Sequence, residues 1–281
     1  ILRESPATAT IDADGGLGII MGGPAMRLAI QKARNTGMGV VAMHNSGHMG
    51  AVGHFAMMAA KENMVGISMT AVSLRVAPTF AAEALLGTNP IAIAAPTKRE
   101  PPFLFDAATS TIAENKLGLA ARVGANLLPG WVSDSQGRPQ LEEIPAPSRG
   151  DYHMLPLGGT REQGSHKGYG LAMMVEVLTT FLAGTLPQAL NPEGRARSHF
   201  AAYDISAFTE IDAFKESLDS MLKTLRTSKP AEGHERVLYP GLPEYEAEQD
   251  RLVNGIPLHK EVIQWFEDIT TELSLPGLKT L

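Results

Sequence analysis

The sequence predicts an α/β fold built on a mixed sheet, and three observations support this class. Helix and strand patterns alternate from residue 24 to residue 72, which favours β-α-β units. Short apolar runs at 91–95 and 103–105 follow without a helix between them, which indicates that the sheet is mixed. The chain has 281 residues, 44% of them hydrophobic, and can therefore bury a substantial core.

The composition narrows the classes of function. The formal net charge of −6 gives no support for a surface that binds nucleic acid or an anionic membrane. The chain has no cysteine, which excludes disulfides, thiolate metal sites and a cysteine nucleophile and fits a cytoplasmic location. The longest apolar run, from Gly170 to Gly184, is too short to span a membrane and carries Glu176.

The predicted elements begin with a strand and turn over residues 8–14. Pro24 opens the first predicted helix at its first position, and Gly37 ends it. The apolar face of this helix carries Met26, Ala29, Ile30 and Ala33. Next come a strand at 38–43, a helix at about 51–63 and a strand at 65–70.

The rest of the chain is predicted to hold several helices separated by loops. A helix over 109–123 leads into an excursion rich in proline and glycine over 124–164. The helix over 168–183 is apolar nearly all round, so we expect it to be buried, and a polar loop follows at 185–197. The last predicted helices are an amphipathic one through Phe214, Leu218, Met221, Leu222 and Leu225, and two more near 243–253 and 259–273.

The segment His44-Asn-Ser-Gly-His-Met-Gly50 is the most informative part of the chain. It places His48 between a predicted strand and a predicted helix, a favoured position for catalytic groups in α/β folds. An imidazole there can shuttle a proton near neutral pH, although a solvated loop histidine is the alternative. His44 and His48 are four residues apart, a zinc-binding spacing on a helix. The intervening residues suit a loop and no nearby carboxylate completes the set, so we predict no metal site.

Two further segments could bind an anion. In Phe105-Asp-Ala-Ala-Thr-Ser110, free backbone N–H groups at the predicted helix start could hold a phosphate, with an ordinary helix cap as the alternative. Lys167-Gly-Tyr-Gly170 offers a cation and exposed amides just before the helix at 168, with tight helix packing as the alternative. Arg195 and Arg197 in the polar loop could clamp a substrate carboxylate, or could be solvated surface residues.

The standard nucleotide motifs are absent from the sequence. Gly15-Gly-Leu-Gly18 does not match GxGxxG, and no GxxxxGK[ST] loop occurs, which argues against a standard Rossmann or P-loop site. Taken together and in order, however, seven segments resemble the malate/L-lactate dehydrogenase family of the non-Rossmann type, and they cover nearly the whole chain. They are Asn45-Ser-Gly-His-Met-Gly50, Leu85-Leu-Gly-Thr-Asn-Pro-Ile-Ala-Ile-Ala-Ala-Pro96, Phe105-Asp-Ala-Ala-Thr-Ser110, Gly130-Trp-Val-Ser-Asp134, Leu155-Pro-Leu-Gly-Gly159, His166-Lys-Gly-Tyr-Gly-Leu171 and Tyr239-Pro-Gly241.

The resemblance implies a three-layer α/β fold with a mixed sheet and additional C-terminal helices. It also implies a homodimer that binds NAD or NADP near the subunit interface. His48 matches the family's acid/base histidine, and Arg195 lies near a substrate-binding arginine. The positions that match cofactor-binding residues are Val72, Asp106, Ala107, Ala108, Lys167, Gly233, His234 and Glu235. Family members often have serine where this chain has Val72, so the resemblance implies a backbone contact there unless Ser73 substitutes.

The resemblance also divides the chain into two parts. Residues 1–239 are expected to form the α/β domain that binds cofactor and substrate, and residues 240–281 a helical segment. In the family this segment packs with an N-terminal helical segment that carries another active-site histidine and an arginine. Nothing in this chain matches the N-terminal segment, so we expect upstream residues to be missing.

The expected function is therefore an NAD(P)-dependent oxidoreductase that interconverts a small 2-hydroxy acid and its 2-oxo acid. One alternative is a cyclic-imine carboxylate reductase on the same scaffold. The other is a dimeric nucleotide-binding protein that lacks catalysis.

Overall fold

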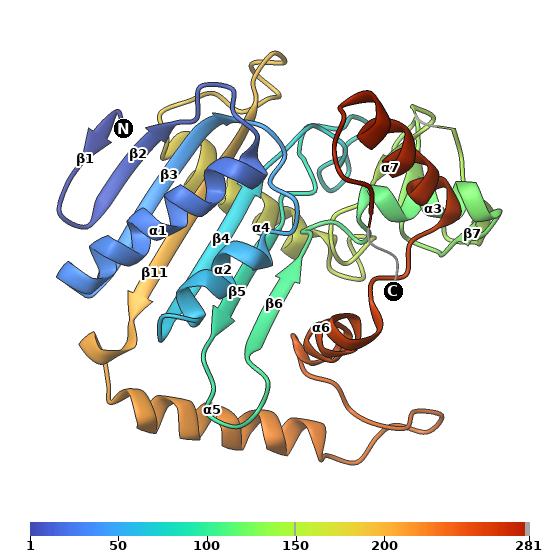
Figure 1. Cartoon of the computed structure of the whole chain (residues 1–281). Coiled ribbons are helices and arrows are strands. Elements are labelled where there is room, and N and C mark those ends of the chain that lie inside the picture. Colours follow the sequence, from blue (N-terminus) through green and yellow to red (C-terminus); the bar gives the residue numbers. More distant parts are fainter. Residues whose placement is uncertain (149, 279–281) are drawn as a thin grey trace.

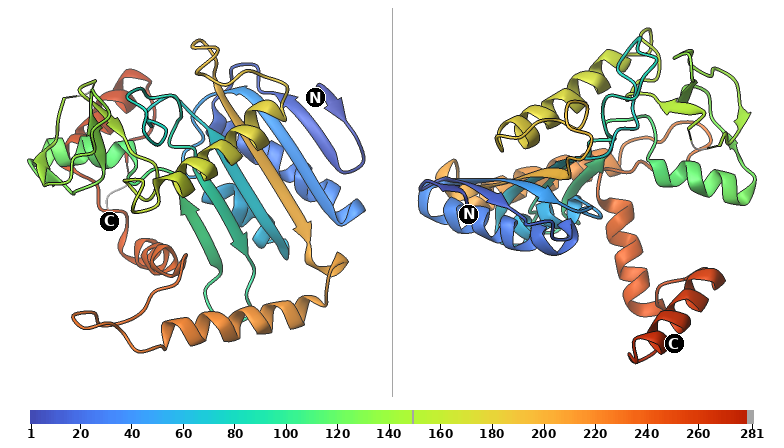
Figure 2. Two further views of the ribbon diagram at one scale, coloured as in Figure 1. Left: turned by 180° about the vertical axis from the view of Figure 1, so that it is seen from behind. Right: turned by 90° about the horizontal axis from the view of Figure 1, so that it is seen from above.

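The computed structural model describes residues 1–148 and 150–278, and its centre is a seven-stranded mixed sheet (Figure 1). The strands lie in the order β1-β2-β3-β11-β4-β5-β6. Helices α1 and α2 cover one face and α4 crosses the other, which confirms the three-layer mixed-sheet fold (Figure 2). The strands are β1 (Arg3–Glu4), β2 (Thr8–Asp12), β3 (Met38–Ser46), β4 (Met64–Ala71), β5 (Ile91–Ala95), β6 (Phe103–Ala107) and β11 (Ala196–Asp204).

The order of the strands explains why the sheet is mixed. Strands β2 and β3 are parallel and are joined through α1 (Gly18–Thr36), as the alternating pattern predicts. Strand β11 lies between β3 and β4 and is antiparallel to both. The sequence did not predict β11, since residues 185–197 were expected to be a polar loop with no strand after it. Its buried Arg197, Ser198 and His199 break the apolar pattern of a central strand.

The face under α1 and α2 (Gly53–Ala60) is closely packed because small residues let backbones approach. A Cβ atom at Gly39 would lie 2.0 Å from the carbonyl oxygen of Ala29, and one at Gly66 would lie 2.2 Å from that of Ala56. Gly37 ends α1 in the left-handed conformation with φ 84°, as predicted. Pro24 was expected at the first helical position, but it lies inside α1, which begins at Gly18.

The opposite face is crossed by α4 (Ser165–Glu176), which continues into the π-helix η1 (Val177–Phe181). The sequence predicted that this segment is buried, and this is wrong for one of its sides. Only the side toward the sheet is buried, because α4 and η1 lie on the outside of the chain. The exposed apolar side chains are those of Leu171, Met174, Val177, Phe181 and Leu182.

The helix predicted from residue 109 begins later, as α3 (Glu114–Val123). The amides of Thr109 and Thr111 donate to the carbonyl oxygens of Thr88 and Leu155 and so are not helical. The segment after α3 holds short strands and packs around Val132 and Met154. These strands are β7 (Asn126–Leu127), β8 (Val132–Asp134), β9 (Ile144–Pro145) and β10 (Tyr152–Met154).

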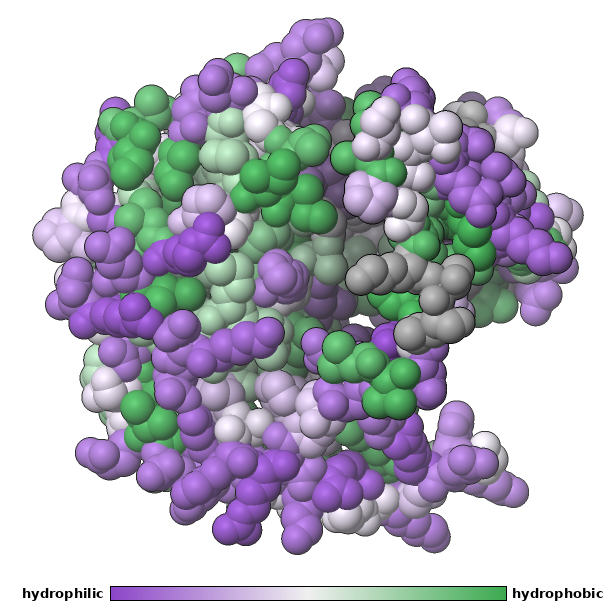
Figure 3. Space-filling view, in the orientation of Figure 1, coloured by the Kyte–Doolittle hydropathy of each residue, from purple (hydrophilic) through white to green (hydrophobic). Residues whose placement is uncertain are grey.

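Of the remaining helices, α5, α6 and α7 agree closely with prediction, whereas the short helix η2 was not predicted. These helices are the 3₁₀ helix η2 (Ile205–Ala207), α5 (Ile211–Arg226), α6 (Leu242–Asn254) and α7 (Lys260–Glu272). No helix within the described ranges is long and apolar enough to cross a membrane. Figure 3 shows a hollow between the body of the sheet and the part that carries α3 and α7, and hydrophobic surface at the start of α1, where Ile19 and Ile20 are exposed.

Candidate active site

One end of the sheet gathers most of the predicted site residues. Strands β3, β4 and β6 end there, while the antiparallel strands β5 and β11 begin there. His48 follows β3, Val72 follows β4, Asp106 lies near the end of β6, and Arg195 directly precedes β11. Segments far apart in the sequence therefore meet at this end of the sheet.

A β-bulge in β3 shapes the loop that carries His48. Ser198 pairs with Met43 but Ala196 pairs with Ser46, so β3 has one extra residue between these two pairs. Asn45, within the bulge, has φ 56°, and its side-chain amide donates to Asp12 Oδ1 over 2.9 Å. Bulges turn a strand and redirect the side chains that follow, and this one leads into the exposed loop of His48.

A hydrogen bond from the backbone holds the ring of His48. The backbone N–H of Gly50 donates to His48 Nδ1 over 2.9 Å. Nδ1 is therefore an acceptor, and a neutral ring in this arrangement carries its proton on Nε2. The ring thus presents an N–H donor from Nε2.

Two small cavities meet at His48. Both are lined by His48, Val72 and Ser73. The first, of about 220 Å³, is called here the arginine pocket, and it is also lined by Ser46, Gly47, Gln188, Gly194, Arg195, Ala196 and Arg197. The second, of about 200 Å³, is called the paired pocket, and it is also lined by Arg75, Thr88, Ala113, Glu114 and Asn115.

The two pockets differ in charge. In the paired pocket, Arg75 Nε donates to Glu114 Oε1 over 2.7 Å, so the cation is balanced by a carboxylate. The residues that line the arginine pocket include two arginines and no carboxylate. Arg195 Nη1 donates to the carbonyl oxygen of Gly15 over 3.1 Å, which orients that side chain. The arginine pocket therefore suits an anion, and the paired pocket suits a neutral polar group.

A buried polar network fixes the backbone of Val72 between the pockets. The Val72 N–H donates to Asn89 Oδ1 over 3.2 Å, and Asn89 Nδ2 donates to Glu176 Oε1 over 3.0 Å. Thr180 Oγ1 donates to the other carboxylate oxygen of Glu176 over 2.6 Å. The sequence analysis did not single out Asn89, although it lies in one of the segments that carry the family resemblance.

Asp106 contacts a helix other than the one predicted. Its Oδ2 accepts the backbone N–H of Gly53 over 2.7 Å, at the start of α2. The expectation that residues 106–108 open a helix with free amides is wrong, because β6 runs to Ala107 and α3 begins only at Glu114. Partial desolvation raises the pKa of the Asp106 carboxyl, although the side chain stays open to solvent on one side.

Lys167 lies in the first turn of α4, and its side chain is exposed. The two glycines beside it differ. A Cβ atom at Gly168 would lie 2.4 Å from the backbone nitrogen of Leu157, so this glycine serves tight packing. Gly170 faces open space. The packing alternative thus explains Gly168 and leaves Lys167 and Gly170 available to a ligand.

Gly233, His234 and Glu235 are not brought to His48. They lie in the exposed loop between α5 and α6. That loop is near the start of β6, where Phe103 packs with Leu222 and Tyr239, at the other end of the sheet. Their role in cofactor binding stays a prediction.

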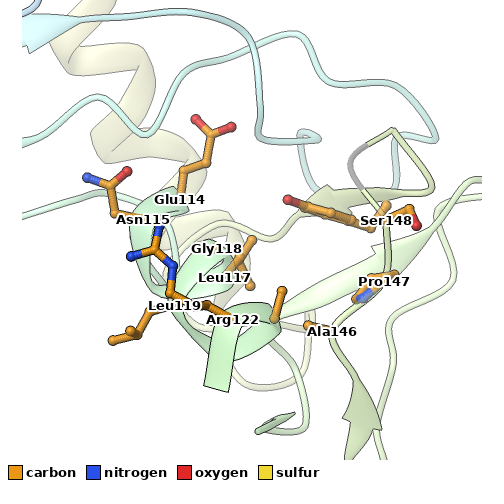
Figure 4. Close-up of a pocket in the computed structure, with 11 residues that line it drawn as sticks. Glu114, Asn115, Leu117, Gly118, Leu119, Arg122, Ala146, Pro147 and Ser148 are labelled. Atoms are coloured by element: carbon orange, nitrogen blue, oxygen red, sulfur yellow. The ribbon is translucent and has the colours of Figure 1, made fainter. Parts of the chain in front are cut away.

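A larger groove adjoins the paired pocket. It has a volume of about 810 Å³ and lies between α3 and residues 146–152 (Figure 4). It shares Glu114 and Asn115 with the paired pocket, which is therefore bordered by open space on this side. Within the described residues, no group of three or more His, Asp or Glu side chains is placed to hold a metal ion.

Comparison with known proteins assigns a class to this arrangement. The family model described as malate/L-lactate dehydrogenase matches residues 1–267. The chain is 40% identical to a malate dehydrogenase of Pyrococcus abyssi, over 99% of this chain and 78% of that protein. It is 37% identical to an L-sulfolactate dehydrogenase of Methanocaldococcus jannaschii, over 98% of this chain and 78% of that protein.

Solved structures agree with these sequence matches. The fold superposes on malate dehydrogenase from Entamoeba histolytica with a TM-score of 0.91 at 31% identity, over 98% of this chain and 79% of that one. It is also similar to a Δ1-piperideine-2-carboxylate reductase from Pseudomonas syringae, with a TM-score of 0.78 at 28% identity, over 95% of this chain and 78% of that one.

The fold and the matches define a dehydrogenase acting on the CH–OH group of 2-hydroxy acids with a nicotinamide cofactor. The chain belongs to the malate/L-lactate dehydrogenase family.

Proposed function

We propose that this chain interconverts a small 2-hydroxy acid and its 2-oxo acid, using NAD or NADP, with His48 as the proton carrier. The observation that carries the proposal is the position of His48, a titratable side chain that borders both the arginine pocket and the paired pocket. For hydride transfer, the substrate and the nicotinamide ring must lie next to each other, and the substrate oxygen must also lie within reach of the proton carrier. Two adjoining cavities that share His48 could hold the two molecules in this way.

The charges of the pockets support one orientation. The substrate carboxylate would bind in the arginine pocket, where Arg195 offers a planar pair of N–H donors. The nicotinamide carboxamide both donates and accepts hydrogen bonds, and the paired pocket offers Thr88, Glu114 and Asn115 as matching partners. The bound cofactor gives or takes the hydride, while the protein supplies orientation and electrostatics.

The rest of the cofactor would contact the residues that the family resemblance implies. Val72 offers only its backbone, and its N–H is already bound to Asn89. Asp106, Ala107, Ala108 and Lys167 lie on segments tied together through Leu157, whose N–H donates to the Thr109 carbonyl. We assign Gly233, His234 and Glu235 to the far end of the same ligand.

The hydrogen bond at His48 Nδ1 bears on the proton step. In the oxidation of the hydroxy acid, Nε2 must accept the hydroxyl proton, and this requires a free lone pair on Nε2. With Gly50 N–H bound to Nδ1, the neutral ring has its proton on Nε2. His48 therefore acts as base only after Gly50 releases Nδ1. Nitrogen-15 NMR of the ring should show the Nε2–H tautomer in the free enzyme and a change of tautomer in the ternary complex.

The test of the proposed function is turnover. NADH and NADPH oxidation would be measured with a panel of 2-oxo acids and cyclic imino acids, in wild type and in His48→Ala. We expect one class of substrate to turn over, and His48→Ala to lower kcat by about 100-fold or more while the cofactor still binds. Lys167→Ala should instead weaken cofactor binding first. Turnover that survives in His48→Ala would remove the histidine from the mechanism.

Two other functions would be recognised in the same experiment. The fold similarity to a piperideine carboxylate reductase favours cyclic imino acids as the second class of substrate, with a protonated nitrogen in place of the carbonyl oxygen. Nucleotide-induced stabilisation without any turnover would identify a nucleotide-binding protein that lacks catalysis.

We propose that the working unit is a homodimer located in the cytoplasm. The exposed apolar residues on α4 and η1 form a side that a second copy could cover, and large exposed apolar patches mark interaction sites. The helical segment 240–281 would be a separate packing unit. Its last helix, α7, is amphipathic and buries none of its residues in this chain, which favours a further helical partner for it.

A further inference from the structure

A buried arginine without an ion pair lies at the wall of the arginine pocket. Arg197 is 4% exposed and lies in β11, one residue after the start of the strand. Among the described residues, its side chain makes one hydrogen bond, from Nη2 to the carbonyl oxygen of Leu186, over 2.6 Å. Within residues 1–148 and 150–278, no carboxylate forms an ion pair with it. A buried charge is costly unless it is paired, so this position calls for an anion.

Arg197 lines the arginine pocket and keeps two nitrogens for a ligand. Among the described residues, no fully buried side-chain nitrogen or oxygen lacks a hydrogen-bond partner. Nε and Nη1 of Arg197 have no hydrogen-bond partner among these residues, so neither atom is fully buried, and Arg197 lines the arginine pocket. The N–H groups of Nε and Nη1 are therefore left to donate to a carboxylate or a sulfonate that enters this pocket.

The surrounding backbone makes room for this guanidinium. A Cβ atom at Gly194 would lie 2.1 Å from Arg197 Nη2, so only glycine at 194 allows the side chain this position. The Arg197 carbonyl accepts the hydroxyl of Thr70 over 3.0 Å, which fixes the backbone of the residue against β4. The side chain is thus held in place before any ligand binds.

Glu176 is the carboxylate that acts on Arg197 electrostatically. Burial lowers the pKa of Arg197 and Glu176 partly restores it. However, the oxygens of Glu176 accept hydrogen bonds from Asn89 and Thr180, and Glu176 forms no ion pair with Arg197. Glu176 therefore reduces the cost of the buried cation without occupying its hydrogen-bonding edge.

We propose that Arg197 binds a second acidic group of the substrate, so that Arg195 and Arg197 together select 2-hydroxy and 2-oxo acids that carry two acidic groups. The proposal rests on the proposed function and names the substrate class of the same site. The second group would be a carboxylate or a sulfonate on the carbon that follows the hydroxyl-bearing carbon.

The first experiment measures binding, which does not depend on turnover. Succinate and butanoate have the same chain length and differ by one carboxylate, and calorimetry would compare them in wild type and Arg197→Met. We expect wild type to prefer succinate by about 100-fold, and Arg197→Met to lose that preference, because a charge-assisted pair is removed. The matched control is Arg236→Met. Arg236 is an exposed arginine in the loop between α5 and α6 and pairs with Glu246, so this variant should keep the preference for succinate.

The second experiment measures kcat/KM for oxaloacetate and pyruvate in the same variants. Arg197→Met should lower the value for oxaloacetate by about 100-fold, mainly through KM, and change that for pyruvate less than about threefold. Arg197→Lys should restore part of the loss. Equal losses for both substrates would show a structural role, and no loss for oxaloacetate would overturn the proposal.

The thermal stability of Arg197→Met separates folding from binding. Replacing an unpaired buried ion by an apolar side chain of similar length should leave Tm unchanged or raise it. Succinate should raise Tm in wild type and not in the variant. If the protein prefers succinate but turns over no 2-oxo acid, the Arg197 site is supported and the proposed function fails. If the wild type turns over 2-oxo acids but does not prefer those with two acidic groups, the proposed function is supported and the Arg197 site fails.

Discussion

The two faces of the central sheet are covered in opposite ways. Under α1 and α2 the side chains are buried and many of them are alanines, and Gly39 and Gly66 let the helices approach to backbone contact. On the other face, α4 and η1 form one rod whose outer side exposes Val177 and Phe181. The first face is completed within the chain, whereas the second ends in apolar surface. The residues of the first face therefore stabilise the fold of the chain itself, whereas the exposed apolar residues of the second face could contact another protein chain.

The largest expected effect comes from adding a side chain where α2 packs directly on the sheet, on the face that α1 and α2 cover. Gly66→Ala would place a Cβ atom 2.2 Å from the Ala56 carbonyl oxygen and 2.8 Å from Ala59 Cβ. Helix α2 must then move away from β4, so we expect the free energy of unfolding to fall by about 3 kcal/mol. Urea denaturation would measure it.

Gly170→Ala in α4 is the matched control, since nothing lies within 4 Å of the added Cβ. Because alanine favours helix, stability should rise by about 0.5–1 kcal/mol. A loss of cofactor affinity in this variant would indicate that a ligand approaches Gly170. Equal destabilisation by the two changes would contradict the difference between the faces.

The next effect concerns assembly at the incomplete face. Phe181→Glu puts a charge on an apolar side chain that is 48% exposed. If a second copy covers this side, the dimer dissociation constant should rise by about 100-fold or more, because the charge would be buried without a partner. Sedimentation equilibrium would follow the mass. Phe208→Glu, at a more exposed phenylalanine on another surface, should leave the mass unchanged.

The smallest effect is a dependence of stability on pH at the joint between β11 and η1. His199 is buried, its Nδ1 pairs with the Leu178 carbonyl oxygen over 3.2 Å, and burial lowers its pKa below the ordinary 6.5. As the pH falls through 6.5 the unfolded chain binds the proton first, so stability falls until the folded pKa is passed. The slope cannot exceed about 1.4 kcal/mol per pH unit.

His199→Asn keeps a donor for the Leu178 carbonyl and removes the titration. Urea denaturation at pH 7.5, 6.5 and 5.5 should show a smaller loss of stability in this variant than in wild type. Parallel losses in the two proteins would mean that other groups control the acid sensitivity.

Local patterns were enough to predict much of the fold. The helices α2, α5, α6 and α7 and the strands β4 and β5 follow from apolar periodicity, and Gly37 ends α1 as predicted. Strand β11 could not be predicted because Arg197, Ser198 and His199 are polar residues whose burial depends on partners far along the chain. The late start of α3 has a similar cause, since distant carbonyl groups hold the amides of Thr109 and Thr111.

The candidate site was predictable in part. His48 stands out because its loop follows a strand and precedes a helix, and the structure brings Val72 and Arg195 to the same cavity. The sequence placed Arg197 beside Arg195 but could not distinguish a buried cation from a solvated one. That distinction depends on the absence of a side chain at Gly194 and on the position of β11 in the sheet. Asn89 acts through its side-chain amide, which accepts the backbone N–H of Val72, and no local pattern reveals this contact.

The central place of β11 has a consequence for how the chain matures. Ala196 meets Ser46 across 150 positions of sequence, so two strands made early in synthesis cannot pair fully until this late strand emerges from the ribosome. Until then β3 and β4 expose open edges that invite aggregation. Such distant pairing makes closure of the sheet slow. Because Arg197 arrives on the same strand, the binding pocket can assemble only in that last step.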